Sequence, residues 1–346
     1  MTSPNWGLKS PLDLFSRFFQ PVKAQSAPPS PLIGPISPVP IPSSPVQAEP
    51  DLIAMGAVSR STSGKALSLS FLEKMTPAAA PAPAPAMQKI EYQKPVQLRE
   101  GVMMYMPQNP LKVDQSVDVI IQFRGDVPQR FAQSGVPAVV ISAETSGLSG
   151  AMMEKFGQKE FVPQILETVK ARLEKQYGPQ VKIGRLALGS FSAGYAPLQV
   201  ALSNPAVSAR TDAVMVIDGI HYGAKGKPNP AAHQPFVDFA KAAAAGQKMM
   251  VITHSAIQPS YSSSTDAADY ILKAAGAQRQ PLASAEPDGQ DSNRYKERIA
   301  PANRADRGSF HVEGFAGNQA RNHVEQIDNL GNLWARYLAP RWNTSP

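Results

Sequence analysis

The sequence predicts an α/β fold, in which a mainly parallel sheet carries helices on both faces, and two observations lead to this prediction. From residue 89 onward, short and continuously apolar segments alternate with segments of helical periodicity. Strands buried on both faces of a parallel sheet are continuously apolar, and alternation with helices is typical of such sheets. The expected strands are 90–92, 102–105, 117–123, 136–142, 183–188, 213–217, 248–253 and 309–315. The expected helices are 161–177, 196–202, 236–245, 266–275 and 323–338.

The early elements follow from their boundaries as well as from their apolar residues. The segments 90–92 and 102–105 are expected to form an opening pair of strands, and 117–123 a longer buried one that ends at Arg124-Gly125-Asp126. Helix 161–177 is closed by Gly178-Pro179, because proline cannot continue a helix.

The later elements end at residues that matter for chemistry. Strand 183–188 runs through small residues into helix 196–202, and strand 213–217 ends at Asp218. In a parallel sheet, ligands bind outside the carboxyl ends of the strands. Each residue that closes a strand is therefore a candidate for the functional site.

Proline separates the chain into two parts. The first 100 residues hold 17 of the 34 prolines, in runs that form neither helix nor sheet interior. We therefore expect a mostly disordered arm rich in Pro, Ala and Ser over residues 1–87 and one folded domain over 88–346. Residues 11–20 form a short amphipathic stub within the arm, which either folds back on the domain or docks on a partner protein. The residues do not separate these alternatives.

Composition narrows the remaining classes of protein. The chain has no cysteine, which excludes disulfides and thiolate metal sites, and it has no apolar run of membrane-spanning length. No signal peptide is recognised, so the expected compartment is the cytoplasm by default. The net charge of +7 is thinly spread, and the densest basic cluster, within 294–307, contains acidic residues. That cluster is interpreted as a solvated loop or face, and nucleic-acid binding is not expected.

Residues 190–194, Ser-Phe-Ser-Ala-Gly, lie between a strand and a helix with no room for a loop. A serine at such a corner presents its hydroxyl above the sheet, and the following backbone N–H groups point towards a bound group. Ser192 is therefore the candidate nucleophile, flanked by the small residues Ser190 and Gly194. The full elbow pattern is Gly-x-Ser-x-Gly, and Ser190 replaces its first glycine. The alternative is an ordinary strand-to-helix turn that only needs small residues.

The order of elements resembles the α/β-hydrolase superfamily, in particular its serine esterases and lipases, over about residues 88–343. The chain departs from the family pattern at Ser190 and lacks a His-Gly-Gly-Gly sequence. The resemblance places the catalytic histidine after the last strand, at or just before the start of the final helix. His323 matches that place, whereas His311 lies within the expected last strand. Of the three other histidines, His221 and His254 are expected to line the pocket rim or to bond locally.

The resemblance also implies a buried acid and two oxyanion donors. Asp218 is the preferred acid, although the commoner family position is one strand later, where Asp266 or Asp269 lies. The segment around Asp266 is equally consistent with a helix cap. The backbone N–H of Ala193 is expected to be one oxyanion donor. The loop with Gly125 is expected to provide the other, and its candidate residues are Arg124, Gly125 and Asp126.

These observations predict a serine hydrolase that cleaves a carboxylic ester, or an amide, through an acyl-enzyme intermediate. The substrate is a small or acylated molecule, and no cofactor or metal is expected, because no nucleotide, phosphate or zinc motif is present. The pocket is either open or covered by residues 143–157, whose glycines and methionines suit a lid. The alternative is a non-catalytic binding or assembly module with a hydrolase-like fold, tethered to a larger complex by the arm.

Overall fold

The structure is a computed structural model that describes residues 89–125, 128–282 and 301–343. The predicted arm, with its stub at 11–20, lies outside the described residues, so the arm and the domain boundary at residue 88 stay predictions.

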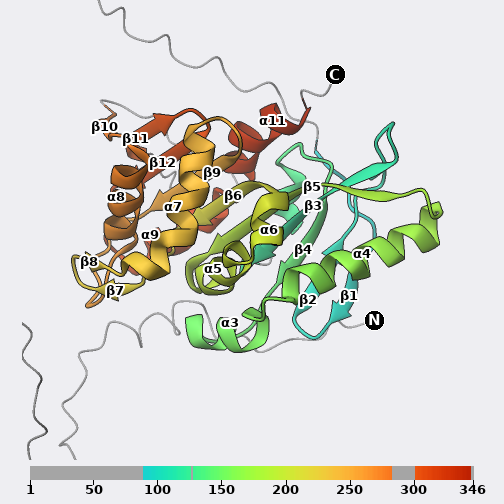
Figure 1. Ribbon diagram of the computed structural model, residues 1–346, viewed down its shortest axis with the longest axis horizontal. Helices are drawn as coiled ribbons and strands as arrows, with labels where there is room; N and C mark the ends of the chain where they lie inside the picture. Colours follow the sequence, from blue (N-terminus) through green and yellow to red (C-terminus); the bar gives the residue numbers. More distant parts are fainter. Residues whose placement is uncertain (1–88, 126–127, 283–300, 344–346) are drawn as a thin grey trace, which may run out of the picture. The chain divides into compact units, whose positions relative to one another are not determined.

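A mixed sheet of ten strands organises the described part of the chain (Figure 1). The strand order is β1-β2-β4-β3-β5-β6-β9-β12-β11-β10. The six neighbouring strands from β4 to β12 are parallel, and the strands at both ends are antiparallel. The strands are β1 (Val96–Arg99), β2 (Val102–Tyr105), β3 (Ser116–Phe123), β4 (Val139–Ala143), β5 (Lys182–Phe191), β6 (Thr211–Ile217), β9 (Met249–His254), β10 (Gln280–Pro281), β11 (Pro301–Arg307) and β12 (Phe310–Phe315), and a separate hairpin joins β7 (Gly223–Ala224) to β8 (Lys227–Pro228). The prediction of a mainly parallel sheet is confirmed.

Helices cover both faces of this sheet. One face packs against α3 (Ser149–Phe156), α4 (Phe161–Tyr177), α5 (Tyr195–Ser203), α6 (Pro205–Arg210), α7 (Pro230–Ala244) and α8 (Ser264–Ala275). The other face packs against α2 (Pro128–Ala132), α9 (Ala320–Asp328), α10 (Leu330–Leu333), the π-helical turn η2 (Trp334–Leu338) and α11 (Ala339–Asn343). The predicted covering of both faces is confirmed.

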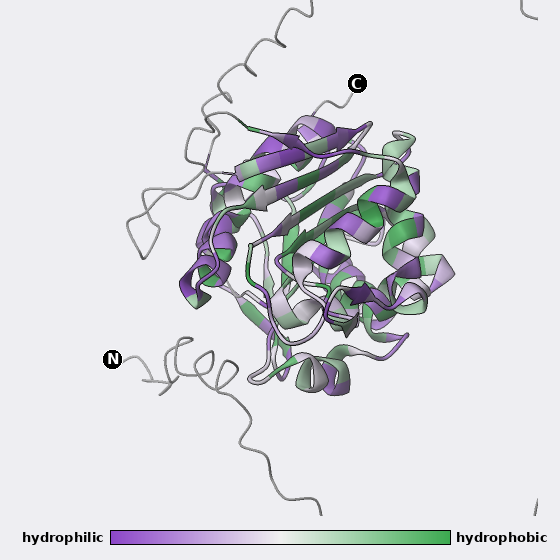
Figure 2. Cartoon of the chain, turned by 90° about the vertical axis from the view of Figure 1, so that its left-hand side faces the viewer, coloured by the Kyte–Doolittle hydropathy of each residue, from purple (hydrophilic) through white to green (hydrophobic). Residues whose placement is uncertain are grey.

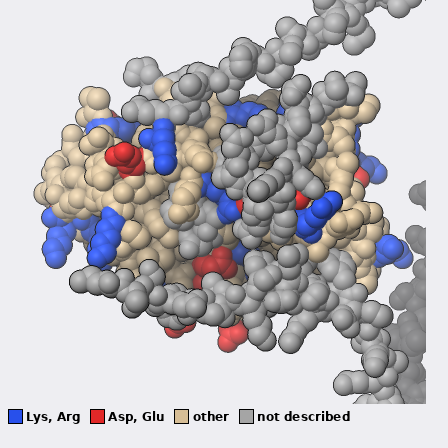
Figure 3. Space-filling model, turned by 180° about the vertical axis from the view of Figure 1, so that it is seen from behind, with Lys and Arg blue, Asp and Glu red and all other residues tan. Residues whose placement is uncertain are grey.

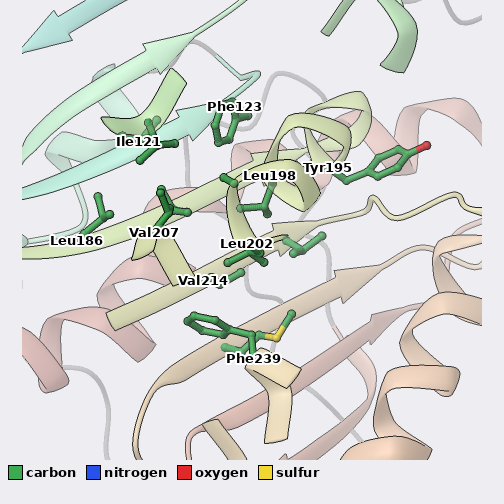
Figure 4. Packing of buried hydrophobic residues seen from close by; sticks show 14 of the residues in the cluster. Ile121, Phe123, Leu186, Tyr195, Leu198, Leu202, Val207, Val214 and Phe239 are labelled. Carbon is green, nitrogen blue, oxygen red and sulfur yellow. The ribbon is translucent and has the colours of Figure 1, made fainter. Parts of the chain in front are cut away.

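The pattern along β6 shows why its sequence is continuously apolar. Val214 and Val216 belong to the core on the α5 side, whereas Met215 and Ile217 belong to the core on the α9 side. Side chains alternate across a strand, so a strand buried on both faces needs an apolar residue at every position. Figure 4 shows Leu202 of α5 beside Val214, and the apolar interior of the sheet is visible in Figure 2.

Several elements differ from those expected, and the predicted helix 236–245 is the longer helix α7, Pro230–Ala244. Residues 90–92 are not a strand, although Tyr92 forms an isolated bridge with Pro107, and the opening strand is β1. The polar strand β11 was not expected because its sequence, PANRADR, has no apolar run. The final helix begins at Ala320 and is interrupted at Asn329, beyond which it continues to Asn343.

The basic segment 294–307 is described only from residue 301 onward. Arg304 donates to the buried carboxylate of Glu313, and Arg307 donates to the carbonyls of Ala275 and Gly276. Arg304 is half-buried, which corrects the expectation of a solvated face for this residue, whereas Arg307 is exposed as expected. On the face shown in Figure 3, lysine and arginine side chains lie in separate groups with acidic side chains among them. No helix in the described ranges is long and apolar enough to span a membrane.

Candidate active site

Ser192 lies at a strained corner between β5 and α5. Strand β5 ends at Phe191, the 3₁₀ turn η1 covers Ser192–Gly194, and α5 starts at the next residue. Ser192 has a φ of 50°, in the left-handed region that costs a non-glycine residue about 1–3 kcal/mol. A Cβ atom at position 194 would lie 2.1 Å from the carbonyl oxygen of Phe123. Glycine is therefore required there, because the start of the helix packs directly on β3.

Ser190 occupies the place of the first glycine in the elbow pattern. It pairs with Phe123 of β3, and its side chain is buried. The Ser190 hydroxyl makes no hydrogen bond to any residue of the described segments. Its small size, rather than a polar contact, explains why serine is accepted at this position.

Asp218 follows the last residue of β6 and is fixed from several directions. Its backbone N–H donates to the carbonyl of Thr253 on β9 at 2.9 Å, and its φ is 41°. Its carboxylate is 1% exposed and accepts hydrogen bonds from Ser255 N at 2.9 Å, Ser264 Oγ at 2.5 Å and His323 Nδ1 at 2.7 Å.

The charge state of Asp218 follows from these contacts. Burial by itself would raise the pKa of this carboxyl group. The charge of His323 and the three hydrogen bonds oppose burial, and together they lower the pKa of Asp218 far below its usual range. Asp218 is thus an ionised, buried acceptor.

His323 lies in the first turn of α9 and is held on two sides. Nδ1 faces Asp218, and the ring stacks on Phe191 with 4.8 Å between the ring centroids. The helix start is set by Gln319, whose N–H donates to Asn322 Oδ1 at 3.0 Å. His323 is 5% exposed. An imidazole that donates through Nδ1 keeps Nε2 as its proton acceptor.

Ser192 lies at the same carboxyl edge of the sheet as the paired Asp218 and His323. Phe191, which stacks on His323, directly precedes Ser192. Gly219, which directly follows Asp218, lies so close to the elbow that a Cβ there would be 3.0 Å from the backbone oxygen of Ser192. The serine is therefore bordered by the neighbours of both other residues.

The alternative acid Asp266 has a different partner set. Its Oδ2 accepts hydrogen bonds from the backbone N–H groups of Ser263 and Gly226, and Ser263 Oγ in turn accepts from Asp266 N. These contacts form the capping box of α8. Asp269 pairs with Arg279 on the surface. Of these carboxylates, Asp218 is the one that His323 contacts, so the structural role considered for Asp266 is the one observed.

The expected oxyanion donors are only partly available. The N–H of Arg124 donates to the carbonyl of Ala143 at 2.8 Å, within the sheet, which contradicts its expected role. The N–H of Gly125 donates to Glu144 Oε2 at 2.8 Å. Asp126 lies outside the described residues. Ala193, directly after Ser192, is 8% exposed.

The other histidines bond locally. His221 Nδ1 lies 3.2 Å from the carbonyl of Ser262, and the ring contacts Tyr195 and Tyr261 edge to face. Burial lowers the pKa of His221, and the charge of His323 adds to this effect. His254 Nδ1 lies 3.0 Å from Thr265 Oγ1. In β12, as expected, His311 pairs with Asp306.

Residues 143–157 are packed at their helical part. Met152 and Phe156 of α3 are buried in the core, whereas Leu148 and Met153 are exposed. Among residues 89–125, 128–282 and 301–343, no group of three or more His, Asp or Glu side chains is arranged to hold a metal ion.

Three contributors to the site were missed at the sequence level. Ser255 and Ser264 bond the acid, and Phe191 supports the histidine ring. Phe191 stands inside the elbow sequence, so its position next to Ser192 was an available signal. The two serines stand in a serine-rich loop, where sequence alone does not distinguish a cap from an acid partner.

No protein-family model matches the sequence, and no curated protein matches it. Similar solved structures include the ferric enterobactin esterase of Salmonella typhimurium, with 10% identity, a TM-score of 0.42, and coverage of 70% of this chain and 55% of that one. The feruloyl esterase module of Clostridium thermocellum has 12% identity, a TM-score of 0.35, and coverage of 72% and 89%. The siderophore hydrolase EstB of Aspergillus fumigatus has 9% identity, a TM-score of 0.35, and coverage of 72% and 97%. The chain spans about half the length of the Salmonella esterase. Its own strand order and elbow give it an α/β-hydrolase-like fold.

Proposed function

We propose that the protein is a serine hydrolase that cleaves a carboxylic ester with Ser192 as nucleophile, His323 as base and Asp218 as acid. The observation that carries the proposal is the buried 2.7 Å hydrogen bond between His323 Nδ1 and Asp218 Oδ2, beside a serine with a left-handed backbone. A buried carboxylate that accepts from an imidazole fixes its tautomer and stabilises its protonated form.

In this proposal Ser192 Oγ attacks the substrate carbonyl carbon while His323 Nε2 takes the hydroxyl proton. The tetrahedral intermediate then collapses, the bond to the leaving oxygen breaks, and His323 returns the proton to the departing alcohol. Water attacks the resulting acyl-enzyme with the same histidine as base, and the acid product leaves with Ser192 Oγ reprotonated. Asp218 remains ionised throughout, as its lowered pKa requires.

The oxyanion needs two preorganised N–H donors, each worth about 10²–10³-fold in turnover in other serine hydrolases. The N–H of Ala193 is the first in this proposal, because it follows the nucleophile in η1. The N–H of Gly125 is the second, once the Glu144 carboxylate leaves it. Gly125 has a φ of 91°, and a Cβ there would lie 2.8 Å from Ile327 Cδ1, so glycine suits this position.

The test is labelling of the full chain by a fluorophosphonate probe, which forms a bond only with an activated serine. We expect stoichiometric labelling of the wild type and none of Ser192→Ala or His323→Ala. A control is Ser208→Ala within α6, which should label like the wild type. A folded wild-type protein that takes up no label contradicts the proposal. Hydrolysis of short and long acyl esters and of matched amides would then define the substrate.

The non-catalytic alternative makes the opposite prediction for the same experiment. A module that only binds would not label, and removal of residues 1–87 would abolish its association with a partner. If the truncated protein keeps its turnover but loses its association with the partner, the arm serves to localise the enzyme.

A further inference from the structure

The acid of the proposed site has a second buried side-chain partner. Asp218 Oδ2 accepts a hydrogen bond from His323 Nδ1. Oδ1 accepts one from the Ser264 hydroxyl at 2.5 Å and one from the Ser255 N–H at 2.9 Å. Ser264 is 2% exposed, and Ser255 is 1% exposed. Ser264 is the first residue of α8, so its backbone is fixed by the capping box of that helix.

A carboxylate that faces an imidazole through one oxygen can still rotate about its Cβ–Cγ bond. A donor on the other oxygen prevents this rotation, because both oxygens are then held by groups on separate elements. Ser264 supplies this donor from α8, and Ser255 supplies one from the end of β9. The hydroxyl of Ser264 is a donor here, since an ionised carboxylate can only accept.

We propose that Ser264 is a positioning residue of the active site, which holds the Asp218 carboxylate in the plane that directs His323 towards Ser192. The inference rests on the proposed function, because Asp218 and His323 are its acid and base. It explains why the loop after β9, which holds the commoner family position of the acid, here supplies donors to an acid on β6. The acid thus follows β6, and its hydrogen-bond donors follow the neighbouring strand β9.

The competing explanation is that Ser264 only stabilises the start of α8. The chain offers a matched control, because Ser263 is buried to the same degree, stands one residue earlier and caps the same helix. Ser263→Ala removes a cap hydroxyl and leaves Asp218 untouched. Ser264→Ala removes a hydroxyl of the same size from Asp218 and leaves the cap intact.

The first readout does not depend on turnover. The His323 ring is followed by NMR through a pH titration of the wild type, Ser264→Ala and Ser263→Ala, with His323→Gln assigning its signal among the five histidines. Loss of the Ser264 hydroxyl frees one oxygen of the Asp218 carboxylate, so the His323 titration in Ser264→Ala should differ from that of the wild type. Ser263→Ala should titrate as the wild type. His221, His254 and Tyr261 also couple to Asp218, and they are the same in all three proteins.

The second readout is catalysis. We expect Ser264→Ala to lose about 10- to 100-fold in kcat at nearly unchanged KM, as for a hydrogen bond to a charged group. Ser264→Thr, which keeps the hydroxyl, should restore much of the rate. Ser263→Ala should keep the wild-type rate while it unfolds more easily.

The two failures are distinguishable. If the wild type labels with the probe but Ser264→Ala and Ser263→Ala behave alike in both readouts, the positioning role is wrong and the hydrolase proposal stands. If the wild type does not label while the His323 titration still shifts in Ser264→Ala, the contact orders the pair and the hydrolase proposal fails. If Ser264→Ala does not fold, Ser264→Thr and Ser264→Gly are compared instead. A His323 titration in Ser264→Gly that matches the wild type would overturn the inference.

Discussion

The carboxylate of Glu144 accepts a hydrogen bond from the backbone N–H of Gly125 at 2.8 Å. Glu144 directly follows β4, and Gly125 follows the neighbouring strand β3, so both lie at the edge of the sheet where Ser192 stands. A Cβ at Gly125 would lie 3.7 Å from the Cβ of Phe191. The negatively charged Glu144 side chain therefore accepts from the Gly125 N–H, which would bind the oxyanion in the proposed reaction.

Removal of this carboxylate should accelerate the proposed reaction. Displacing a hydrogen bond to a charged group costs about 1.5–3 kcal/mol, so Glu144→Ala should raise the labelling rate with a fluorophosphonate by about 10-fold or more. Glu154→Ala, at an exposed position of α3, is the control, because it removes an equal charge without touching Gly125. Slower labelling in Glu144→Ala would mean that Glu144 holds the loop in place, and that Gly125 is not the second donor.

The identity of the acid is tested by two asparagine substitutions. Asp218→Asn keeps the size of the side chain but offers an amide to His323, so kcat should fall by about 10⁴-fold through loss of the correct tautomer. Asp266→Asn weakens the capping box of α8 and should cost about 1 kcal/mol of folding free energy with turnover retained. Urea unfolding of both variants separates the two effects. Equal turnover in the two variants would remove Asp218 from its proposed role.

The elbow is tested at its two small residues. Gly194→Ala would place a Cβ 2.1 Å from the Phe123 carbonyl oxygen. We therefore expect the free energy of unfolding to fall by at least about 1–3 kcal/mol and Ser192 to lose its labelling. Ser190→Ala removes a buried hydroxyl that has no partner among the described residues. It should therefore change stability by less than about 1 kcal/mol and leave labelling intact. A Ser190→Ala variant that folds but does not label would give the hydroxyl a function in the site.

The sequence alone predicted the helices and strands that depend on a local pattern of apolar and small residues. Strand β6 is apolar at every position except near its start, and Asp218 directly follows it, so the strand and the place of this carboxylate were predictable. The sharp turn at Ser192 was predictable because only small residues separate an apolar strand from a helix there. Helix α4 was predicted with the bounds that the structure shows.

Long-range contacts were beyond the same reasoning. Strand β11 has a polar sequence and is a strand because it pairs with β12 and β10. The sequence did not show that Ser264 contacts Asp218 whereas Asp266 caps α8. This difference depends on how α8 packs beside β9. Arg124 was a reasonable donor from its position, but its N–H is used by β4, which is a neighbour in the sheet and not in the sequence.

The stability of the fold should fall in mild acid because of two buried histidines. His233 donates through Nδ1 to the carbonyl of Asn229 at 2.6 Å, and His254 is 4% exposed. Burial lowers the pKa of both from the ordinary value of 6.5, and for His254 the charge of Arg279 adds to this effect. Both side chains are therefore neutral in the folded protein at a pH where the unfolded chain protonates them.

Below pH 6.5 the unfolded state binds more protons than the folded state, so the free energy of unfolding decreases as the pH falls from 6.5 towards the folded-state pKa values. Each histidine contributes at most about 1.4 kcal/mol per pH unit. Urea unfolding at pH 7.5, 6.5 and 5.5 measures the slope, and His254→Gln should reduce it. Asp218 adds a separate loss at lower pH, because its pKa is lowered from 3.8 in the folded protein and its protonation therefore favours the unfolded chain. A free energy of unfolding that stays constant between pH 6.5 and 5.5 would show that water reaches both histidines.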